Sequence, residues 1–255
     1  MNVSHNELEG ICRKAFQGIG FSEGDAADAA DMVAWMEVHG LGGIAALKKG
    51  VHFLLKEGES QPPSIIYQDA DVTVLDAHGN SILGNASLAL ELGYVRARAR
   101  GLSVTKIRHC HNRILVIGYL SRLARRGMNV TAFWRNAHDP LTELVVGFRA
   151  GHPIPDLCFY SLEAVPDDIE KNDGITLVMA NHVDLMPGLR SSQPLTNLIQ
   201  HSEPDLVARK AQLLTAGMEV DDDLWKTLKS LADRLLVEAT EDSRSGAGAG
   251  TNDND

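Results

Sequence analysis

The stretch VTVLDAHGNSILGNASLALELGYVRARARGLSVTKIRHCHNRILVIGYLSRLARRGMNVTAFWRN, residues 72–136, decides the fold. Three short runs in it are β-branched or alternate with period two, as strands do: 72–75, 102–107 and 130–134. Two longer runs have apolar residues at helical spacing: 86–100 and 114–126. In the first of these helices, Leu88, Leu92 and Val95 fall on one face.

Strands that alternate with helices of this length indicate crossover units on a partly parallel sheet. The sequence therefore predicts an α/β fold with a mixed, partly parallel sheet, crossover helices and a helical N-terminal part. In open sheets of this kind ligands collect beyond the strand ends. Here those ends carry His78 and the cluster of His109, His111, Asn112 and Arg113.

The N-terminal part shows strong helix signals. Ser4 with Glu7 has the spacing of a capping box, and Ser22 with Asp25 opens a second helix that ends near Gly40. A third amphipathic helix covers 44–55. We therefore divide the chain into a helical part (1–63), an α/β core (64–240) that forms one composite domain with it, and a flexible acidic tail (241–255).

After residue 136 the pattern is less regular. Asp139-Pro140 looks like an N-cap with proline at the first helical position, which predicts a short helix to Val146. The remaining elements expected are strands over 157–162 and 175–180 and helices over 204–216 and 222–239.

Composition limits the classes of function. Hydrophobic residues make up 44% of 255 residues, enough for a well-buried core, and the formal net charge of −10 argues against a nucleic-acid binder. The three cysteines have no CxxC spacing, which fits a reducing compartment. No apolar run approaches membrane length and no signal-peptide layout is present. We expect a cytoplasmic protein with no membrane partner.

One segment is basic, although the chain as a whole is acidic. Between Arg96 and Arg135 there are ten Lys or Arg and no Asp or Glu. One explanation is pairing with acidic faces elsewhere in the fold or in a second subunit. The other is a site for an anion, such as a dinucleotide phosphate or a carboxylate substrate.

His39 is the first candidate for chemistry. It follows a helix C-terminus, where the helix dipole stabilises an imidazolium, and glycines after it would let a ligand approach. A histidine in that place could protonate a carbonyl during hydride transfer. The alternative, which its position alone favours, is a histidine that caps its own helix.

The second candidate is the turn of residues 109–113. Because it follows a strand and precedes a helix, its backbone N–H groups would point at a ligand, and Arg113 could hold a phosphate or carboxylate. The alternative is a polar loop with an ordinary surface arginine. His109 and His111 would also permit a metal, but no third ligand of suitable spacing is evident. The chain has no GxxxxGKS/T loop, no GxGxxG after a strand and no GxSxG elbow.

These residues resemble the type 2 malate/L-lactate dehydrogenase family, whose fold binds NAD or NADP without a Rossmann fingerprint. His39-Gly40 falls where that family has Ser-His-Gly, and Asp76-Ala77-His78-Gly79-Asn80 is similar to its Asp-Gly-Asp/His-Gly segment. The stretch from His111-Asn112-Arg113-Ile114 through Gly118-Tyr119 falls on its Ser-Asn-His-Phe-Gly-x-x-Gly-Tyr. The C-terminal part is more similar to an uncharacterised bacterial family.

The resemblance implies an oxidoreductase that acts on a small 2-oxo or 2-hydroxy acid or a cyclic imine, as a homodimer. His39 would be the catalytic proton donor. The implied binding residues are His111, Asn112, Arg113, Gly118 and Tyr119 for the cofactor, and His78 and Arg113 for the substrate.

The chain departs from that family's motifs. The serine before the histidine is Val38, and the arginine expected four residues after the histidine is Gly43. The motif histidine is Arg113, and the first glycine of the motif is Leu115. The alternative function is therefore a non-catalytic relative that binds a small anion or a protein partner.

Overall fold

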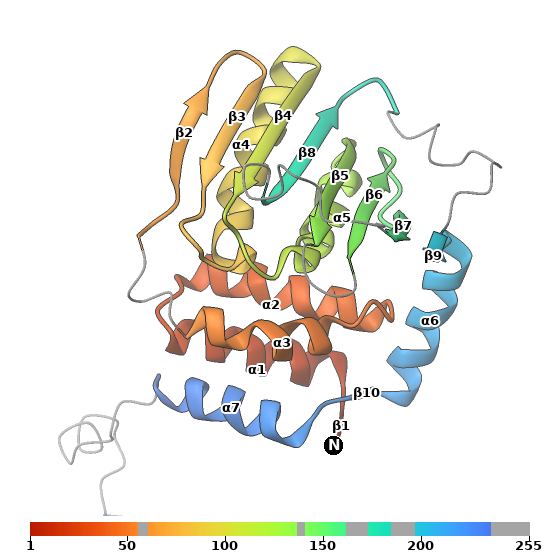
Figure 1. Ribbon diagram of the computed structural model, residues 1–255. Helices are drawn as coiled ribbons and strands as arrows, with labels where there is room; N and C mark the ends of the chain where they lie inside the picture. Colours follow the sequence, from red (N-terminus) through yellow and green to blue (C-terminus); the bar gives the residue numbers. More distant parts are fainter. Residues whose placement is uncertain (56–60, 137–140, 162–172, 185–196, 236–255) are drawn as a thin grey trace, which may run out of the picture.

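The computed structural model describes residues 1–55, 61–136, 141–161, 173–184 and 197–235. In this part of the chain a mixed sheet lies over a layer of helices, and two more helices cover one face of the sheet (Figure 1). The expected α/β class is confirmed. The predictions for the tail (241–255), for the helix start at Asp139-Pro140 and for the end of the last helix lie outside the described residues.

The sheet contains eight strands. In spatial order they are β2 (Ser64–Gln68), β3 (Val72–Asp76), β4 (Leu102–Arg108), β8 (Ile175–Ala180), β5 (Asn129–Asn136), β6 (Thr142–Phe148), β7 (Asp156–Ser161) and β9 (Asn197–His201). Strands β3 and β4 pair in parallel, and every other pairing is antiparallel. Helix α4 (Ile82–Arg100) connects the parallel pair, so the crossover unit expected from the sequence is present.

Helix α5 (Val116–Arg125) makes the second crossover, from β4 to β5. Strand β8 lies between these two strands and runs antiparallel to both, which explains why the sheet is only partly parallel.

The helical layer is built around α2 (Glu23–Val38). This helix packs against α1 (His5–Gly18), α3 (Gly43–Leu54), α4 and α5. It is buried on several sides, and its alanines allow close approach of these neighbours. The capping box predicted at the start of α1 is present: the Glu7 N–H donates to Ser4 Oγ at 3.3 Å, and Glu7 Oε2 accepts from the Ser4 N–H at 2.8 Å.

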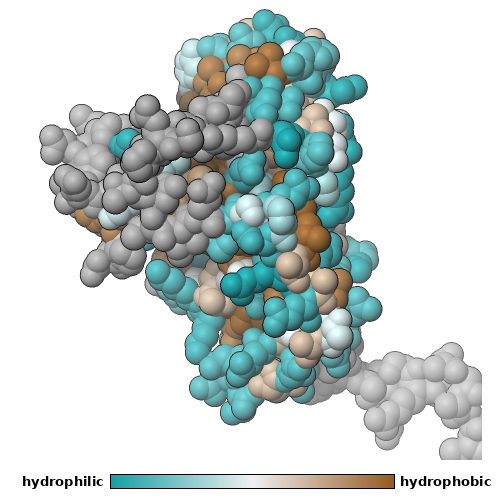
Figure 2. Space-filling model, turned by 90° about the vertical axis from the view of Figure 1, so that its right-hand side faces the viewer, coloured by the Kyte–Doolittle hydropathy of each residue, from teal (hydrophilic) through white to brown (hydrophobic). Residues whose placement is uncertain are grey.

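The C-terminal part returns to this layer. Strand β10 (Met218–Glu219) pairs with β1 (Asn2–Val3), and α7 (Asp222–Asp233) packs against α1. Helix α6 (Glu203–Ala216) runs down the outside of the molecule and buries only Leu206 (Figure 1). Figure 2 shows the face that carries α6, where hydrophobic side chains are scattered among hydrophilic ones.

One expectation was wrong. Residues 142–146, expected as the end of a helix, belong to strand β6, which pairs along its whole length with β5. In α4 the face of Leu88, Leu92 and Val95 is not the buried one, since Leu88 and Val95 are each 60% exposed. The buried face combines the large residues Ile82, Leu83 and Leu90 with the small residues Ala86, Ala89, Gly93 and Ala97.

The basic segment is largely neutralised within the chain. Arg100 pairs with Asp71, Arg113 with Asp173, Arg126 with Glu91 and Arg135 with Glu143. Arg122 on α5 pairs with Asp28 and Asp31 on α2. Pairing inside the fold, the first of the two explanations, is therefore confirmed for these five arginines. The three cysteines are buried free thiols, and no helix of the described residues has the length and apolar character needed to cross a bilayer.

Candidate functional site

Two turns meet where the parallel strands β3 and β4 end. Asp76, the last residue of β3, is level with Arg108, the last residue of β4. Backbone hydrogen bonds then tie the following residues together: the Gly79 N–H donates to the His109 carbonyl at 2.7 Å, and the His111 N–H donates to the Asn80 carbonyl at 3.0 Å. The sequence placed candidate residues in both turns, and the structure brings the two turns into contact.

The backbone of these turns is unusual. Within the described residues, the non-glycine residues with positive φ are His78 (51°), His109 (50°) and Asn112 (57°), all in these two turns. Left-handed conformations are uncommon outside glycine, although histidine and asparagine tolerate them better than most residues do. Such conformations persist where the surrounding structure holds them, and they cluster at functional sites.

Asp76 is the acceptor shared by both turns. Its carboxylate accepts the His78 N–H at 2.8 Å and lies 2.9 and 3.0 Å from the His109 ring nitrogen Nδ1. Burial by itself would raise the pKa of Asp76. The hydrogen bonds from the His78 backbone and the His109 ring, with the attraction of both imidazoles, hold the pKa below its ordinary value.

A cavity of about 990 Å³ opens beside the second turn. One wall comes from the start and one side of α3, and the other from residues 109–114. The ends of β5, β6 and β7, with Asp173, complete it. Its volume falls within the usual range of small-molecule and cofactor sites. Apolar side chains such as Phe53 and Leu144 line it together with a few polar groups, which is the usual composition of such sites.

The contact between the two walls is specific. The His111 ring stacks on Phe53 with centroids 3.6 Å apart and planes inclined by 8°. The Asn112 side chain donates to the Gly50 carbonyl at 3.4 Å, and a Cβ on Gly50 would lie 1.8 Å from Asn112 Oδ1. Only glycine at position 50 therefore lets the turn approach α3 in this way. Burial, followed by the charge of Arg113, lowers the pKa of His111.

Arg113 is held in place on the edge of the cavity. Its guanidinium pairs with Asp173 and also donates to the Arg135 carbonyl at 3.2 Å. Its side chain is 17% exposed. Lys49, which also lines the cavity, is exposed and has no acidic partner in the part of the chain that the structure describes. The lining contains two cationic side chains, Lys49 and Arg113, and three histidines, and its acidic residue is Asp173. A lining of this kind favours anions.

The structure does not bring His39 to this cavity. The ring is fully buried, stacks on Trp35 with centroids 4.0 Å apart, and donates from Nδ1 to the Trp35 carbonyl at 2.7 Å. Its Nε2 is buried and has no hydrogen-bond partner in the described part of the chain. Burial, the largest cause, lowers the pKa of His39 to about 4. In this conformation His39 is a neutral core residue, so the geometry gives no support to the catalytic role expected for it.

Three further expected site residues also lie outside the cavity lining. Gly118 on α5 packs directly on the backbone of Met32 in α2, and the Tyr119 hydroxyl donates to Glu91 at 3.1 Å. His78 Nε2 is 2.9 Å from the Ser64 hydroxyl. Of the binding residues implied by the resemblance, the structure gathers His111, Asn112 and Arg113. Sequence reasoning missed Lys49 and Phe53, whose only signal was their position on the amphipathic helix after the glycines.

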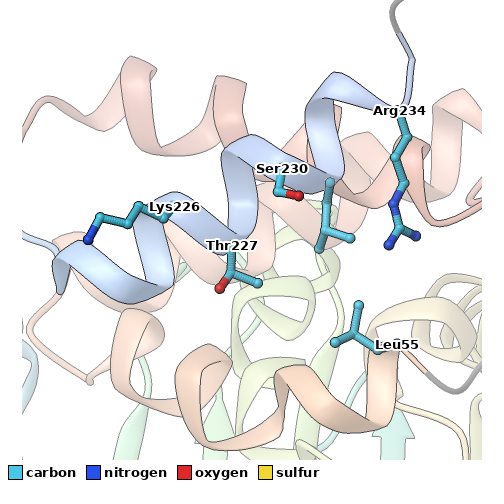
Figure 3. A pocket seen from close by; sticks show the side chains of 6 residues that line it. Leu55, Lys226, Thr227, Ser230 and Arg234 are labelled. Atoms are coloured by element: carbon cyan, nitrogen blue, oxygen red, sulfur yellow. The ribbon is translucent and has the colours of Figure 1, made fainter.

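A second, smaller hollow of about 340 Å³ lies between the end of α3 and one face of α7. Figure 3 shows Leu55 on one side of it, with Thr227, Ser230 and Arg234 on the other. Its lining, as far as the structure describes the chain, has no pair of interacting titratable groups and no contact with the strand ends. We therefore take the larger cavity as the candidate site.

Comparison with known proteins bears on the fold. A family model described as "Protein of unknown function (DUF3726)" matches residues 3–87. No curated protein matches the chain. Solved structures of dehydrogenases and reductases do match it over nearly its whole length.

Malate dehydrogenase from Pyrococcus horikoshii is 12% identical with a TM-score of 0.64, over 93% of this chain and 96% of that one. A dehydrogenase from Sinorhizobium meliloti is 16% identical with a TM-score of 0.64, over 91% and 99%. The delta1-piperideine-2-carboxylate reductase from Pseudomonas syringae is 12% identical with a TM-score of 0.58, over 91% and 99%. At such identities the likeness establishes a shared fold.

Proposed function

We propose that this chain is a divergent relative of the type 2 malate/L-lactate dehydrogenases and that its cavity binds a nicotinamide dinucleotide with a small 2-oxo acid, 2-hydroxy acid or cyclic imine. The observation that carries the proposal is the cavity itself. It lies at the carboxyl ends of two parallel strands, and its lining combines cations, imidazoles and stacked rings.

The lining suits the chemistry of a dinucleotide. Gly42 and Ala45, at the start of α3, both line the cavity. The Ile44 N–H in this first turn already donates to Glu37 Oε2 at 2.8 Å, so the binding of phosphate oxygens would depend on the cationic side chains. Lys49 and Arg113 supply positive charge, and the Phe53–His111 stack supplies a flat surface for a ring. A bound reduced nicotinamide would supply a hydride. The chain would hold the two ligands and exclude water from them.

A second candidate is a non-catalytic relative that binds the same class of anion. The observations that favour it are the buried His39 and Gly43 at the position of the family's arginine. It predicts saturable cofactor binding with no turnover of any 2-oxo acid. The first candidate predicts oxidation of the reduced cofactor when the correct 2-oxo acid or imine is added.

Isothermal titration calorimetry with NADH and with NADPH tests the proposed site. Wild-type protein is expected to bind at least one of them saturably. Ala45 is exposed and lines the cavity, so Ala45→Trp should occupy part of the cavity without disturbing the fold and weaken binding at least about tenfold, or about 1.4 kcal/mol.

The matched control is Ala208→Trp, which adds the same side chain at an exposed position on α6 away from the cavity and should leave binding unchanged. Equal affinities in wild-type protein and Ala45→Trp, or no binding at millimolar cofactor, would remove the proposal.

A further inference from the structure

His109 stands out among the cavity residues because a carboxylate fixes its ring. Nδ1 lies 2.9 and 3.0 Å from the two carboxylate oxygens of Asp76, which is the geometry of a ring N–H shared between both. Asp76 ends β3 and His109 follows β4, so the pair joins two adjacent parallel strands. The sheet therefore sets the distance between them.

Asp76 is itself held in place. Its side chain is 15% exposed and also accepts the His78 N–H at 2.8 Å, while His78 Nδ1 lies 3.6 Å from the same oxygen. A carboxylate that is fixed in this way and accepts Nδ1–H favours the imidazole tautomer with a free Nε2, and it stabilises the ring when Nε2 gains a proton. This is the role of the acid in an acid–histidine pair.

The opposite edge of the His109 ring is open. His109 lines the cavity and its side chain is 43% exposed, and Nε2 has no hydrogen-bond partner among the described residues. The other charged or titratable groups that line the cavity are Lys49, His52, Cys110, His111, Arg113 and Asp173. Among the described residues, His109 is the one cavity histidine that pairs with a carboxylate.

We propose that His109 is the catalytic acid–base residue of this cavity, with Asp76 as its positioning residue, and that it serves the carbonyl oxygen of a 2-oxo acid. The proposal rests on the proposed function and moves the acid–base role from His39 to a different element of the fold. Lys49, at the same cavity, would attract the substrate carboxylate.

The proton balance is simple. When the carbonyl carbon gains a hydride, with its two electrons, from a reduced nicotinamide, the π pair of the C=O bond moves onto oxygen. That oxygen takes the proton from Nε2 of the His109 imidazolium and becomes a hydroxyl group. The nicotinamide is oxidised, the carbonyl is reduced, and the neutral imidazole regains its proton from water. Asp76 keeps its charge throughout and balances the imidazolium before the transfer.

Nitrogen-15 NMR of the histidine side chains, with oxamate as a non-reducible analogue of a 2-oxo acid, tests the assignment without cofactor. Wild-type His109 is expected as the Nδ1–H tautomer, and oxamate should shift its ring signals. Asp76→Asn should remove the tautomer preference. His152, an exposed histidine away from the cavity, should not respond. A wild-type Nε2–H tautomer, or His109 signals that oxamate leaves unchanged, would overturn the proposal.

Measurement of turnover in variants is the second test of the assignment. His109→Gln should lower kcat about a hundredfold or more with little change in cofactor affinity, while His152→Gln should match wild type. Turnover by His109→Gln within a few-fold of wild type would overturn the assignment. Absence of cofactor binding in wild-type protein would instead remove the proposed function, and the oxamate experiment would still decide whether His109 faces the anion.

Discussion

Gly118→Ala is expected to lower the free energy of unfolding by about 2 kcal/mol, whereas Gly10→Ala is expected to raise it by roughly 0.5–1 kcal/mol. Both glycines lie inside helices, so the gain in helix propensity is the same. They differ in surroundings. A Cβ on Gly118 would lie 2.7 Å from Met32 Cα and 2.9 Å from the Met32 carbonyl oxygen, while a Cβ on Gly10 would meet nothing within 4 Å.

The clash at Gly118 is with backbone, which cannot turn aside as a side chain can, so α2 and α5 must separate. Unfolding of the two variants by denaturant measures the effect. The free energy of unfolding should fall in Gly118→Ala and rise in Gly10→Ala. Cofactor affinity of folded Gly118→Ala should equal that of wild type, because Gly118 does not line the cavity. An unchanged stability, or a selective loss of cofactor affinity, would contradict the close α2–α5 contact and favour the binding role expected from the sequence.

Acidification from pH 7 to pH 5 is expected to remove about 2 kcal/mol of stability through His39 alone. Burial lowers the pKa of this residue to about 4 from an ordinary value of 6.5. Between these two values the unfolded chain binds a proton that the folded chain does not. The contribution is therefore complete above pH 6.5 and is lost as the pH falls towards 4.

Unfolding by denaturant at pH 7 and at pH 5 measures this effect in wild type and in His39→Gln. The variant should be less stable at pH 7, because the bond to the Trp35 carbonyl is weakened or lost, but its fall in stability between the two pH values should be about 2 kcal/mol smaller. An NMR titration should show His39 neutral down to pH 5. A His39 that titrates near 6.5 would mean that its ring reaches solvent, and would restore it as a candidate proton donor.

Local signals in the sequence predicted local structure well. The Ser4–Glu7 capping box begins α1 as expected, and Ser22 begins α2. The alternating run after Gly101 forms β4 in parallel with β3. These features depend on neighbouring residues and on periodicity, which are visible without the rest of the chain.

The sequence was less informative where contacts with distant parts of the chain determine the local structure. In α4, Leu88 and Val95 lie on the exposed face, while Ile82, Leu83 and Leu90 are buried together with small residues such as Gly93, where the helix lies close to β4. The Ser103 hydroxyl donates to the Gly93 carbonyl at 2.7 Å across this contact. Residues 142–148 form a strand because β5 and β7 flank them on both sides, which no local signal reveals.

The site was predicted in part. The turn of His111, Asn112 and Arg113 was found because it follows a strand and precedes a helix. The Asp76–His109 pair was not, although both residues were noted, because they are 33 positions apart and meet only through the register of β3 and β4. Aligning the ends of the two strands expected to be parallel would have revealed it. His39 ends α2 as expected, but its position after a helix gives no information about its burial.

The most direct test of the central claim, that the cavity between α3 and the turn after β4 is the dinucleotide site, is hydrogen–deuterium exchange with the tighter binder of NADH and NADPH. Amide exchange should slow in residues 41–53 and 109–114 and stay unchanged in α6. Slowing confined to other segments, or no slowing at saturating cofactor, would contradict it.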